Sequence, residues 1–334
     1  MTVSKHILVV GATGKQGRAL IEALQPPADL DDIPFRVLAL TRSASSASAQ
    51  RLVQERHVRV VEGDLDSPES IQKVYEDAKS SGGIWGVFCV LAPPGLGANP
   101  DGEERQGKSM ADLALEYGVS VYIYSTAERG GEQIDEKQLS GRAKVLAERH
   151  VQALGEKGLP WTIMRPGFFL DNYTDFIVTV AVMTRGLKKD SKLGVVDPKD
   201  IGHVAAGVFK NPEKYKHQIL VVVEDVLTMS EQHASYKRAT GRALPSVPGF
   251  LATMLLAWNK AAQELVRHFE SIHNARITGQ YEHFESQLNL GRKAYPQMKT
   301  VYDWAVEQQK NKGQQENAAD WNKVSLWRLM LGKS

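Results

Sequence analysis

The sequence predicts an α/β protein with a doubly wound parallel sheet and a smaller, mainly helical lobe. Over the first half of the 334-residue chain, short runs of β-branched and apolar residues alternate with longer amphipathic segments. This alternation is typical of a parallel sheet whose strands are joined by helical crossovers. Several of the runs are apolar on both faces, as strands covered by helices on both sides must be. A glycine-rich turn at residues 11–17 directly follows the first run.

Each predicted strand is one of the apolar runs, and each predicted helix is the amphipathic segment that follows it. The strands are expected at residues 6–10, 35–41, 58–62, 84–91, 119–125 and 160–165. The helices are expected near residues 15–25, 44–56, 68–79, 103–117 and 138–155. Such a succession of β-to-β crossovers favours a doubly wound fold.

After Pro166 the order of elements changes and the chain becomes mainly helical. Helices are expected near residues 173–185, 200–210, 250–270 and 301–308, with one strand at 218–223. The run Thr228-Met229-Ser230-Glu231 is typical of a capping box and predicts a helix that ends near Gly241. We therefore divide the chain into a doubly wound domain (1–165), a mainly helical lobe that shares one strand with the sheet (166–309), and a C-terminal segment (310–334).

The C-terminal segment begins with a polar stretch at residues 310–319, which we interpret as a linker. Trp321, Val324, Trp327 and Met330 follow at three-residue spacing and predict a short amphipathic helix. Two tryptophans on an exposed helix would leave an apolar patch in water. We therefore expect this helix to dock on the lobe near residues 250–269.

Composition and charge argue against several classes of protein. With 41 Lys and Arg against 39 Asp and Glu, the net charge of +2 provides little attraction for nucleic acid. Cys89 is the only cysteine, and together with the lack of a secretory leader it predicts a cytoplasmic location. The longest apolar stretches, at 176–183 and 250–258, are much shorter than the roughly 20 residues of a membrane span. We expect no membrane partner, no metal site, and a monomer or homodimer.

The turn Gly11-Ala12-Thr13-Gly14-Lys15-Gln16-Gly17 has the form G-x-x-G-x-x-G and lies between the first predicted strand and the first predicted helix. In this setting glycines allow a tight turn, a close approach of the backbone to a pyrophosphate, and close packing of helix on strand. We therefore predict a dinucleotide site rather than an ordinary turn. The cofactor-binding residues expected in it are Gly11, Thr13, Gly14, Lys15, Gln16 and Gly17.

The end of the second strand distinguishes NAD from NADP. NAD enzymes usually place Asp or Glu there, to accept hydrogen bonds from the ribose. Here Arg42 is found and no carboxylate is present, which favours the 2′-phosphate of NADP; the alternative is that Arg42 is a solvated surface residue. Asp64 and Leu65 are expected at the adenine, although Asp64 also suits the N-cap of the next helix. Ala92 and Pro93 follow the fourth strand and are expected to line the ribose.

These motifs resemble the NmrA-like family of atypical short-chain dehydrogenase/reductases, over roughly residues 5–241. The matching segments are Gly11–Gly17, Thr41-Arg42, Gly63-Asp64, Glu104–Lys108, Tyr122–Thr126, Lys144–Glu148, Arg165–Phe169 with Asn172, and Asp197–Gly202. The resemblance implies a Rossmann fold and NADP binding, and it adds Lys144, Pro166, Gly167, Phe168 and Phe169 to the cofactor-binding residues. The family is similar both to reductases and to cofactor-sensing regulators, so the choice between enzyme and sensor stays open.

The segment 138–155 matches the helix that carries a Tyr-x-x-x-Lys pair in short-chain dehydrogenases, where the tyrosine donates a proton and the lysine lowers its pKa. Lys144 matches the lysine, but Ser140 stands in place of the tyrosine. Reductases of neighbouring families resemble this arrangement and imply Lys144 itself as acid or base. The alternatives for Lys144 are an ion pair with Glu148, four residues later, and binding of the nicotinamide ribose. Ser125, at the carboxyl end of its strand, is expected to bind a substrate oxygen.

Aromatic and apolar residues of the lobe indicate either a ligand pocket or an ordinary core. Phe168, Phe169, Tyr173, Met254 and Trp258 are candidates for lining a pocket for a hydrophobic or aromatic substrate. Packing in a core is the alternative for each of them.

We therefore predict an NADP(H)-dependent oxidoreductase that transfers hydride to or from a small apolar carbonyl or enone compound, with Lys144 and Ser125 placing its oxygen. The alternative is a non-catalytic NADP/NADPH redox sensor that binds a protein partner. Ser140 favours the sensor, whereas the aromatic residues of the lobe favour the enzyme. A scaffold that docks through residues 321–331 is a third interpretation.

Overall fold

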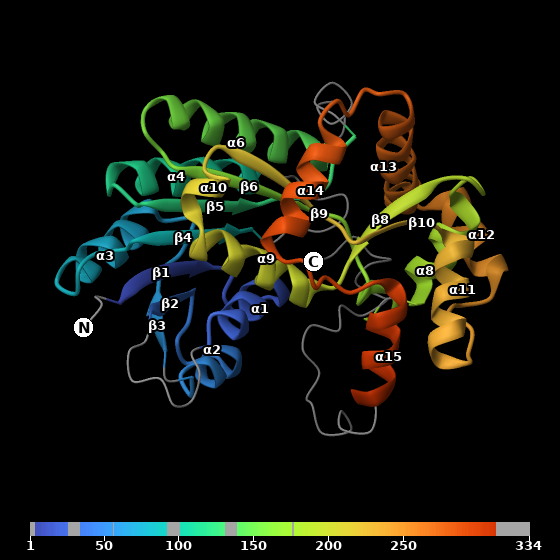
Figure 1. Cartoon of the computed structure of the whole chain (residues 1–334), viewed down its shortest axis with the longest axis horizontal. Helices are drawn as coiled ribbons and strands as arrows, with labels where there is room; N and C mark the ends of the chain where they lie inside the picture. Colours follow the sequence, from blue (N-terminus) through green and yellow to red (C-terminus); the bar gives the residue numbers. More distant parts are fainter. Residues whose placement is uncertain are drawn as a thin grey trace.

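Seven parallel strands form the central sheet, in the order β3-β2-β1-β4-β5-β6-β9 (Figure 1). A computed structural model describes residues 4–25, 34–55, 57–91, 101–130, 139–175 and 177–311. The strands are β1 (Lys5–Val10), β2 (Phe35–Thr41), β3 (Val58–Glu62), β4 (Gly86–Val90), β5 (Val121–Ser125), β6 (Trp161–Pro166) and β9 (Gln218–Val222). The order reverses between β1 and β4, at the topological switch point of a doubly wound sheet. The predicted fold class is confirmed.

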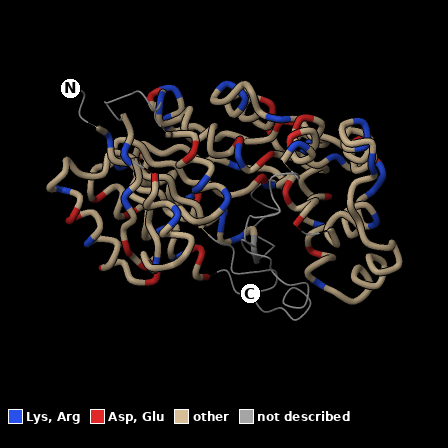
Figure 2. Tube along the Cα trace, turned by 90° about the horizontal axis from the view of Figure 1, so that it is seen from below, with Lys and Arg blue, Asp and Glu red and all other residues tan. Residues whose placement is uncertain are grey.

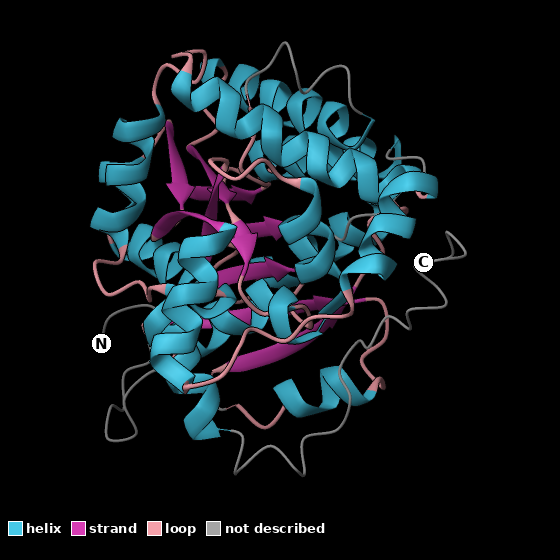
Figure 3. Cartoon of the chain, turned by 90° about the vertical axis from the view of Figure 1, so that its right-hand side faces the viewer, coloured by secondary structure: helices cyan, strands magenta, loops and turns pink. Residues whose placement is uncertain are grey.

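Helices cover both faces of this sheet, as Figure 3 shows with the strands in magenta between cyan helices. One face packs on α1 (Lys15–Ala23), α2 (Ala47–Leu52), α9 (Pro198–Lys210), α10 (Pro212–Tyr215) and α14 (Phe284–Ala294). The other face packs on α3 (Pro68–Lys79), α4 (Asp101–Glu116) and α6 (Leu139–Glu156). Alternate residues of each strand enter the two cores, so that Ile7 and Val9 lie in one and Leu8 and Val10 in the other.

A second sheet organises the lobe, with three strands in the order β10-β8-β7. They are β7 (Phe168–Phe169), β8 (Lys192–Val196) and β10 (Asp225–Thr228). The helices of the lobe are α7 (Asn172–Asp175), α8 (Ile177–Gly186), α11 (Met229–Thr240), α12 (Gly249–Trp258), α13 (Lys260–Ile277) and α15 (Val301–Asn311). The sequence pattern does not predict this sheet, because strands of two to five residues have little periodicity.

The predicted capping box at the start of α11 is confirmed. Thr228 accepts a hydrogen bond of 3.2 Å from the N–H of Glu231, and the Glu231 carboxylate accepts one of 2.7 Å from the N–H of Thr228. The helix ends at Gly241, which has a φ of 69°. Both ends of this helix are therefore encoded by local residues.

The prediction of one long helix at 250–270 is wrong, because the chain breaks at Asn259 into α12 and α13. Asn259 has an extended conformation, and its side chain accepts a hydrogen bond of 3.0 Å from the N–H of Ala262. Asparagine is among the best N-cap residues. The signal for the break was present in the sequence but was masked by the continuous apolar pattern on either side of it.

The residues after 311 lie outside the part of the chain that the structure describes. The predicted helix with Trp321, Val324, Trp327 and Met330 lies outside the described residues, as does the linker from residue 312 onward. Within the described residues, no helix is long and apolar enough to cross a membrane.

Candidate functional site

The glycine-rich turn joins β1 to α1 at the switch point of the sheet, where cofactors bind in folds of this class. Gly11 has a φ of 78°, and a β-carbon on it would lie 2.7 Å from the carbonyl oxygen of Val90. A β-carbon on Gly17 would lie 2.3 Å from the carbonyl oxygen of Gly11. Gly11 therefore makes the tight turn, and Gly17 lets the helix pack against it.

Gly14 is the N-cap of α1 and has no side chain with which to cap the helix. The N–H groups of the first helical turn, among them those of Gln16 and Gly17, have no earlier carbonyl in the helix to bond, and they carry the positive end of the helix dipole. Such a helix start binds anions, including a pyrophosphate. Thr13 is half-buried in the same turn. This helix start with its unpaired N–H groups, preceded by a tight glycine turn, fits the pyrophosphate of a dinucleotide.

Gln16 connects this turn to β5. Its Oε1 accepts a hydrogen bond of 2.7 Å from the hydroxyl of Ser125, which is buried at the carboxyl end of the strand. The fold thus places the serine expected to bind substrate oxygen beside the loop expected to bind the cofactor. In this arrangement the Ser125 hydroxyl donates to Gln16, and a substrate oxygen would compete with that bond.

Lys15, the first residue of α1, extends from the glycine turn to the lobe. Its Nζ lies 2.6 Å from a carboxylate oxygen of Asp175 and 3.1 Å from one of Asp171. Burial by itself would lower the pKa of Lys15, but the charge of Asp171 and the hydrogen bond to Asp175 outweigh burial and raise the pKa above its ordinary value. Lys15 is predicted to bind the cofactor. In this structure its ion pairs with Asp171 and Asp175 connect the glycine turn to the lobe.

Arg42 is exposed just beyond the end of β2. The end of β2 itself carries no carboxylate, but acidic residues from later segments approach this corner. Glu62, the last residue of β3, accepts a hydrogen bond of 2.7 Å from the backbone N–H two residues after Arg42. Hydrogen bonds from Gln106 and Arg105 lower the pKa of Asp66, and the charge of Arg42 lowers it further. These carboxylates lie 20 or more residues along the chain, so the local motif does not reveal them.

Asp64 forms a local turn rather than a helix cap. Its Oδ1 accepts a hydrogen bond of 3.0 Å from the N–H of Asp66. The N-cap of α3 is Ser67, so the alternative role of Asp64 as the N-cap of this helix is wrong. Leu65 is half-buried and packs against the core under α3. Ala92 and Pro93 lie outside the described residues.

Lys144 lies on α6, and its ammonium group donates to the carboxylate of Glu103 on α4. Glu103 is buried, whereas 19% of the Lys144 side chain is exposed. The lobe contributes His268, whose pKa is lowered to about 4 by burial first and by the charge of Lys144 second. His268 is therefore neutral at pH 7. Neither Glu103 nor His268 could be assigned to this site from the sequence, because no short spacing joins either of them to Lys144.

Glu148 does not pair with Lys144, so the alternative of a helical ion pair between them is wrong. Its carboxylate instead accepts hydrogen bonds from Thr126 (2.6 Å), Arg129 (2.5 Å) and Arg165 (2.6 Å). Burial by itself would raise the pKa of Glu148, but the charges of Arg129 and Arg165 outweigh burial and lower the pKa to about 2. This network joins β6 and the segment after β5 to α6, and it thereby orients the helix that carries Lys144. The side chain of Ser140 lies outside the described residues.

The segment after β6 leaves the central sheet and enters the lobe. Pro166 ends β6, and the N–H of Gly167 donates a hydrogen bond of 3.1 Å to the carbonyl of Val222. Phe168 and Phe169 then pair with β8. These four residues of the predicted cofactor set therefore line the junction between the domain and the lobe.

The residues predicted to line an apolar pocket lie in different environments, and the alternative of core packing is confirmed for two of them. Phe168 is buried, with its ring centroid 5.5 Å from that of Tyr173, so both belong to the core of the lobe. Phe169 is half-buried. Met254 and Trp258 are 45% and 77% exposed and point to solvent, so their assignment to a pocket is wrong.

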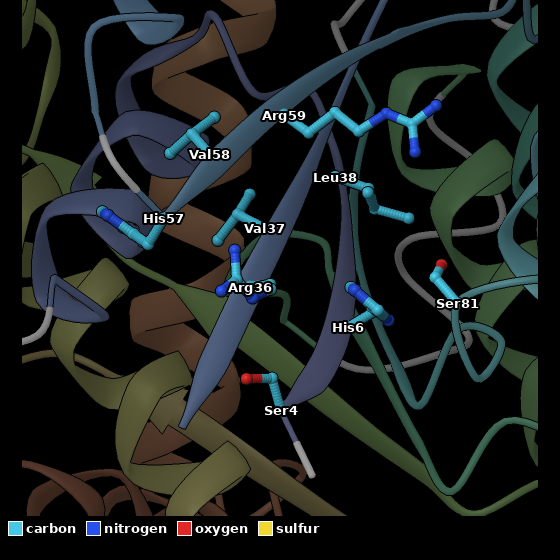
Figure 4. Close-up of a pocket in the computed structure, with 9 residues that line it drawn as sticks. All are labelled: Ser4, His6, Arg36, Val37, Leu38, His57, Val58, Arg59 and Ser81. Atoms are coloured by element: carbon cyan, nitrogen blue, oxygen red, sulfur yellow. The ribbon is translucent and has the colours of Figure 1, made fainter. Parts of the chain in front are cut away.

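A cavity of about 450 Å³ lies at the amino-terminal ends of the strands, opposite to the glycine turn (Figure 4). Its lining residues come mostly from β1, β2 and β3, and they include His6, Arg36 and Arg59. None of the residues predicted to bind the cofactor lines this cavity. Cofactors of doubly wound folds bind at the carboxyl ends of the strands, so this cavity is not the predicted site.

Comparisons with known proteins concern the family and the fold of the chain. The model of the NmrA-like family matches residues 3–305. A (4-alkanoyl-5-oxo-2,5-dihydrofuran-3-yl)methyl phosphate reductase of Streptomyces griseus is 27% identical over 241 residues, which cover 71% of this chain and 75% of the reductase. An NAD(P)H azoreductase of Xenophilus azovorans is 28% identical over 240 residues, covering 71% of this chain and 74% of that protein. The crystal structure of NmrA, a negative transcriptional regulator, in complex with NADP aligns with a TM-score of 0.65 at 19% sequence identity. The alignment covers 95% of this chain and 99% of the NmrA chain.

Proposed function

The chain belongs to the NmrA-like family, and from this premise we propose that it is an NADP(H)-dependent oxidoreductase. We propose further that it transfers hydride to or from a small apolar carbonyl or enone compound. The observation that carries the proposal is the hydrogen bond between Ser125 and Gln16, because it joins the predicted substrate-binding strand to the predicted cofactor loop at the switch point. The relatives described above include a (4-alkanoyl-5-oxo-2,5-dihydrofuran-3-yl)methyl phosphate reductase and an NAD(P)H azoreductase, which supports the class of reaction.

The chain supplies the groups that would hold NADP(H). The first-turn N–H groups of α1 would bind the pyrophosphate, and the guanidinium of Arg42 would bind the 2′-phosphate. Bound there, the cofactor supplies or accepts the hydride. In this proposal Lys144 and Ser125 hold the substrate oxygen, and Lys144 donates or accepts its proton. Glu103 keeps the ammonium group of Lys144 in place, and neutral His268 faces it from the lobe.

A second function, a redox sensor, is favoured by one specific observation. The Lys144 ammonium donates to Glu103, so the proposed proton donor already forms an ion pair within the protein. In a sensor this ion pair would serve only to shape the cofactor site, and the ratio of NADP to NADPH would set the affinity for a protein partner.

Oxidation of NADPH in the presence of quinones, enones and aromatic ketones distinguishes the two functions. An oxidoreductase is expected to turn over at least one of these classes with saturation in substrate. The matched control is the Gly17→Val variant, whose side chain would clash with the turn that binds the cofactor. If no class is turned over and calorimetry shows a large difference in affinity between NADP and NADPH, the sensor is the better description.

The preference for NADP is tested at Arg42. We expect Arg42→Ala to weaken NADPH binding about tenfold or more, because a lost contact between phosphate and guanidinium costs about 1–3 kcal/mol, and to leave NADH binding nearly unchanged. Isothermal titration calorimetry with both cofactors measures this. The control is Arg59→Ala, which removes an exposed arginine near the amino-terminal end of β3. Equal losses for NADPH and NADH would contradict a 2′-phosphate contact.

A further inference from the structure

The helix α12 lies at the far end of the lobe (Figure 1), and its apolar side chains face solvent. Phe250, Leu251, Met254 and Trp258 are 64%, 39%, 45% and 77% exposed. Ala252 is the only residue of α12 that is buried. Contiguous apolar surface of this kind marks an interaction site in a soluble protein. We refer to these four exposed residues as the apolar face.

The packing beneath α12 explains why the apolar face points outward. Leu256 of α12 and Val266 of α13 both approach Gly186 at the end of α8. They lie 3.3 and 2.5 Å from the position that a β-carbon on Gly186 would take. The glycine lets the three helices meet closely, and Ala252 packs in the same core. Phe250, Met254 and Trp258 follow at four-residue spacing on the outer side of the helix.

Basic residues outnumber acidic ones in the segments that adjoin or contain α12. The segments 185–192 and 237–270, which adjoin or contain α12, hold nine Lys and Arg and three Asp and Glu, whereas the whole chain has a net charge of +2. One of the three, Glu270, lies 3.9 Å from the ammonium group of Lys188. Figure 2 shows Lys and Arg positions along this end of the molecule. We call these nine residues the basic rim: Arg185, Lys188, Lys189, Lys192, Lys237, Arg238, Arg242, Lys260 and Arg267. All nine are exposed.

We propose that the apolar face and the basic rim together form a docking surface for an anionic lipid bilayer. A helix with Trp, Phe and Leu on its outer side lies in the membrane interface with that side among the acyl chains, while Lys and Arg beside it contact anionic headgroups. Trp258, the most exposed of the four, has the amphipathic ring that is enriched at such interfaces. The surface would make a peripheral contact with the bilayer, which needs no membrane-spanning segment.

Charge favours a lipid surface over the two occupants that the chain itself could supply. A second copy docked about a two-fold axis would bring two basic rims together, which is unfavourable. The C-terminal segment after Asp320 contains Lys323, Arg328 and Lys333 and no acidic residue, so it would also meet like charge. An anionic bilayer is the occupant that satisfies both the apolar face and the basic rim.

Co-sedimentation of the full-length protein with vesicles tests the proposal. We expect binding to vesicles of phosphatidylcholine with 30% phosphatidylserine, roughly tenfold weaker binding to pure phosphatidylcholine, and weaker binding at high salt. The double variants Phe250→Ser/Trp258→Ser and Lys189→Glu/Lys260→Glu should each lower the affinity for the anionic vesicles at least tenfold. The controls Val53→Ser and Lys216→Glu change exposed residues remote from α12 and should stay within twofold.

Each variant is first checked for an unchanged melting temperature and NADPH affinity, so that loss of vesicle binding is not loss of fold. Deletion of residues 320–334 is tested in parallel. Binding that disappears with this deletion but survives in both α12 double variants would overturn the proposal in favour of the C-terminal segment. Absence of vesicle binding, or a concentration-dependent dimer that Phe250→Ser/Trp258→Ser dissociates, would overturn it in favour of a protein contact.

Discussion

Replacing Lys144 by methionine is expected to lower kcat by two to four orders of magnitude, the range contributed by a positioned general acid or base. Methionine is similar in length but has neither charge nor proton to donate. If Lys144 acts on the substrate oxygen, NADPH affinity should fall only modestly. Steady-state kinetics with the best substrate from the screen, combined with calorimetry for NADPH, separates the two effects.

Two further variants make the test of Lys144 specific. Lys108→Met removes a partly buried lysine of α4 that pairs with Glu104, and it should leave kcat within about twofold of the unmodified protein. Glu103→Gln keeps Lys144 but removes its carboxylate partner, and it should lower kcat to an intermediate value. If Lys144→Met instead reduces NADPH affinity and kcat/KM in equal measure, Lys144 binds the nicotinamide ribose and takes no part in the chemistry.

Replacing Glu148 by glutamine is expected to destabilise the protein by about 3–5 kcal/mol, because it leaves buried arginines without their ion-pair partner. Arg129 and Arg165 are 3% and 9% exposed, and both donate to this carboxylate. Urea unfolding followed by circular dichroism measures the change. Glu76→Gln, at an exposed ion pair of α3 with Lys79, should cost less than about 1 kcal/mol and serves as the control. A loss below about 1 kcal/mol for Glu148→Gln would contradict the role of this network.

The acid dependence of stability provides a second test of Glu148. Its pKa in the folded protein is lowered to about 2, below the value of roughly 4.3 in an unfolded chain. The stabilisation by the ionised carboxylate is therefore fully present above about pH 5 and is lost as the pH falls toward 2. Glu148→Gln should lack this part of the pH dependence, so its stability should fall less steeply between pH 5 and pH 2.

The elements of the central sheet were predictable because their signals are local. The expected bounds of β2, β3 and α3 are the observed ones. Each depends on the period of apolar residues and on nearby turn or cap residues, which a single segment contains. The glycine turn was predictable for the same reason, since the conformation of Gly11 and the close packing of Gly17 are properties of one strand–turn–helix unit.

The contacts of the candidate site were not predictable in this way. Local spacing paired Lys144 with Glu148, four residues along the same helix, but tertiary structure pairs it with Glu103 on α4. Glu148 turns instead to Arg129 and Arg165, which bring two positive charges to one buried carboxylate. In a region of low dielectric, two such partners outweigh the few tenths of a kcal/mol of a helical ion pair.

The sequence by itself therefore determined the doubly wound sheet, the glycine turn and the family resemblance, because periodicity and turn chemistry act over a few consecutive residues. Only the tertiary structure decided that Ser125 donates to Gln16 and that Glu62 approaches the loop of Arg42. It also decided that Trp258 faces solvent rather than a pocket. These outcomes depend on which helices and strands pack together, and the free energy that selects them comes from burial and charge pairing between segments far apart in the chain.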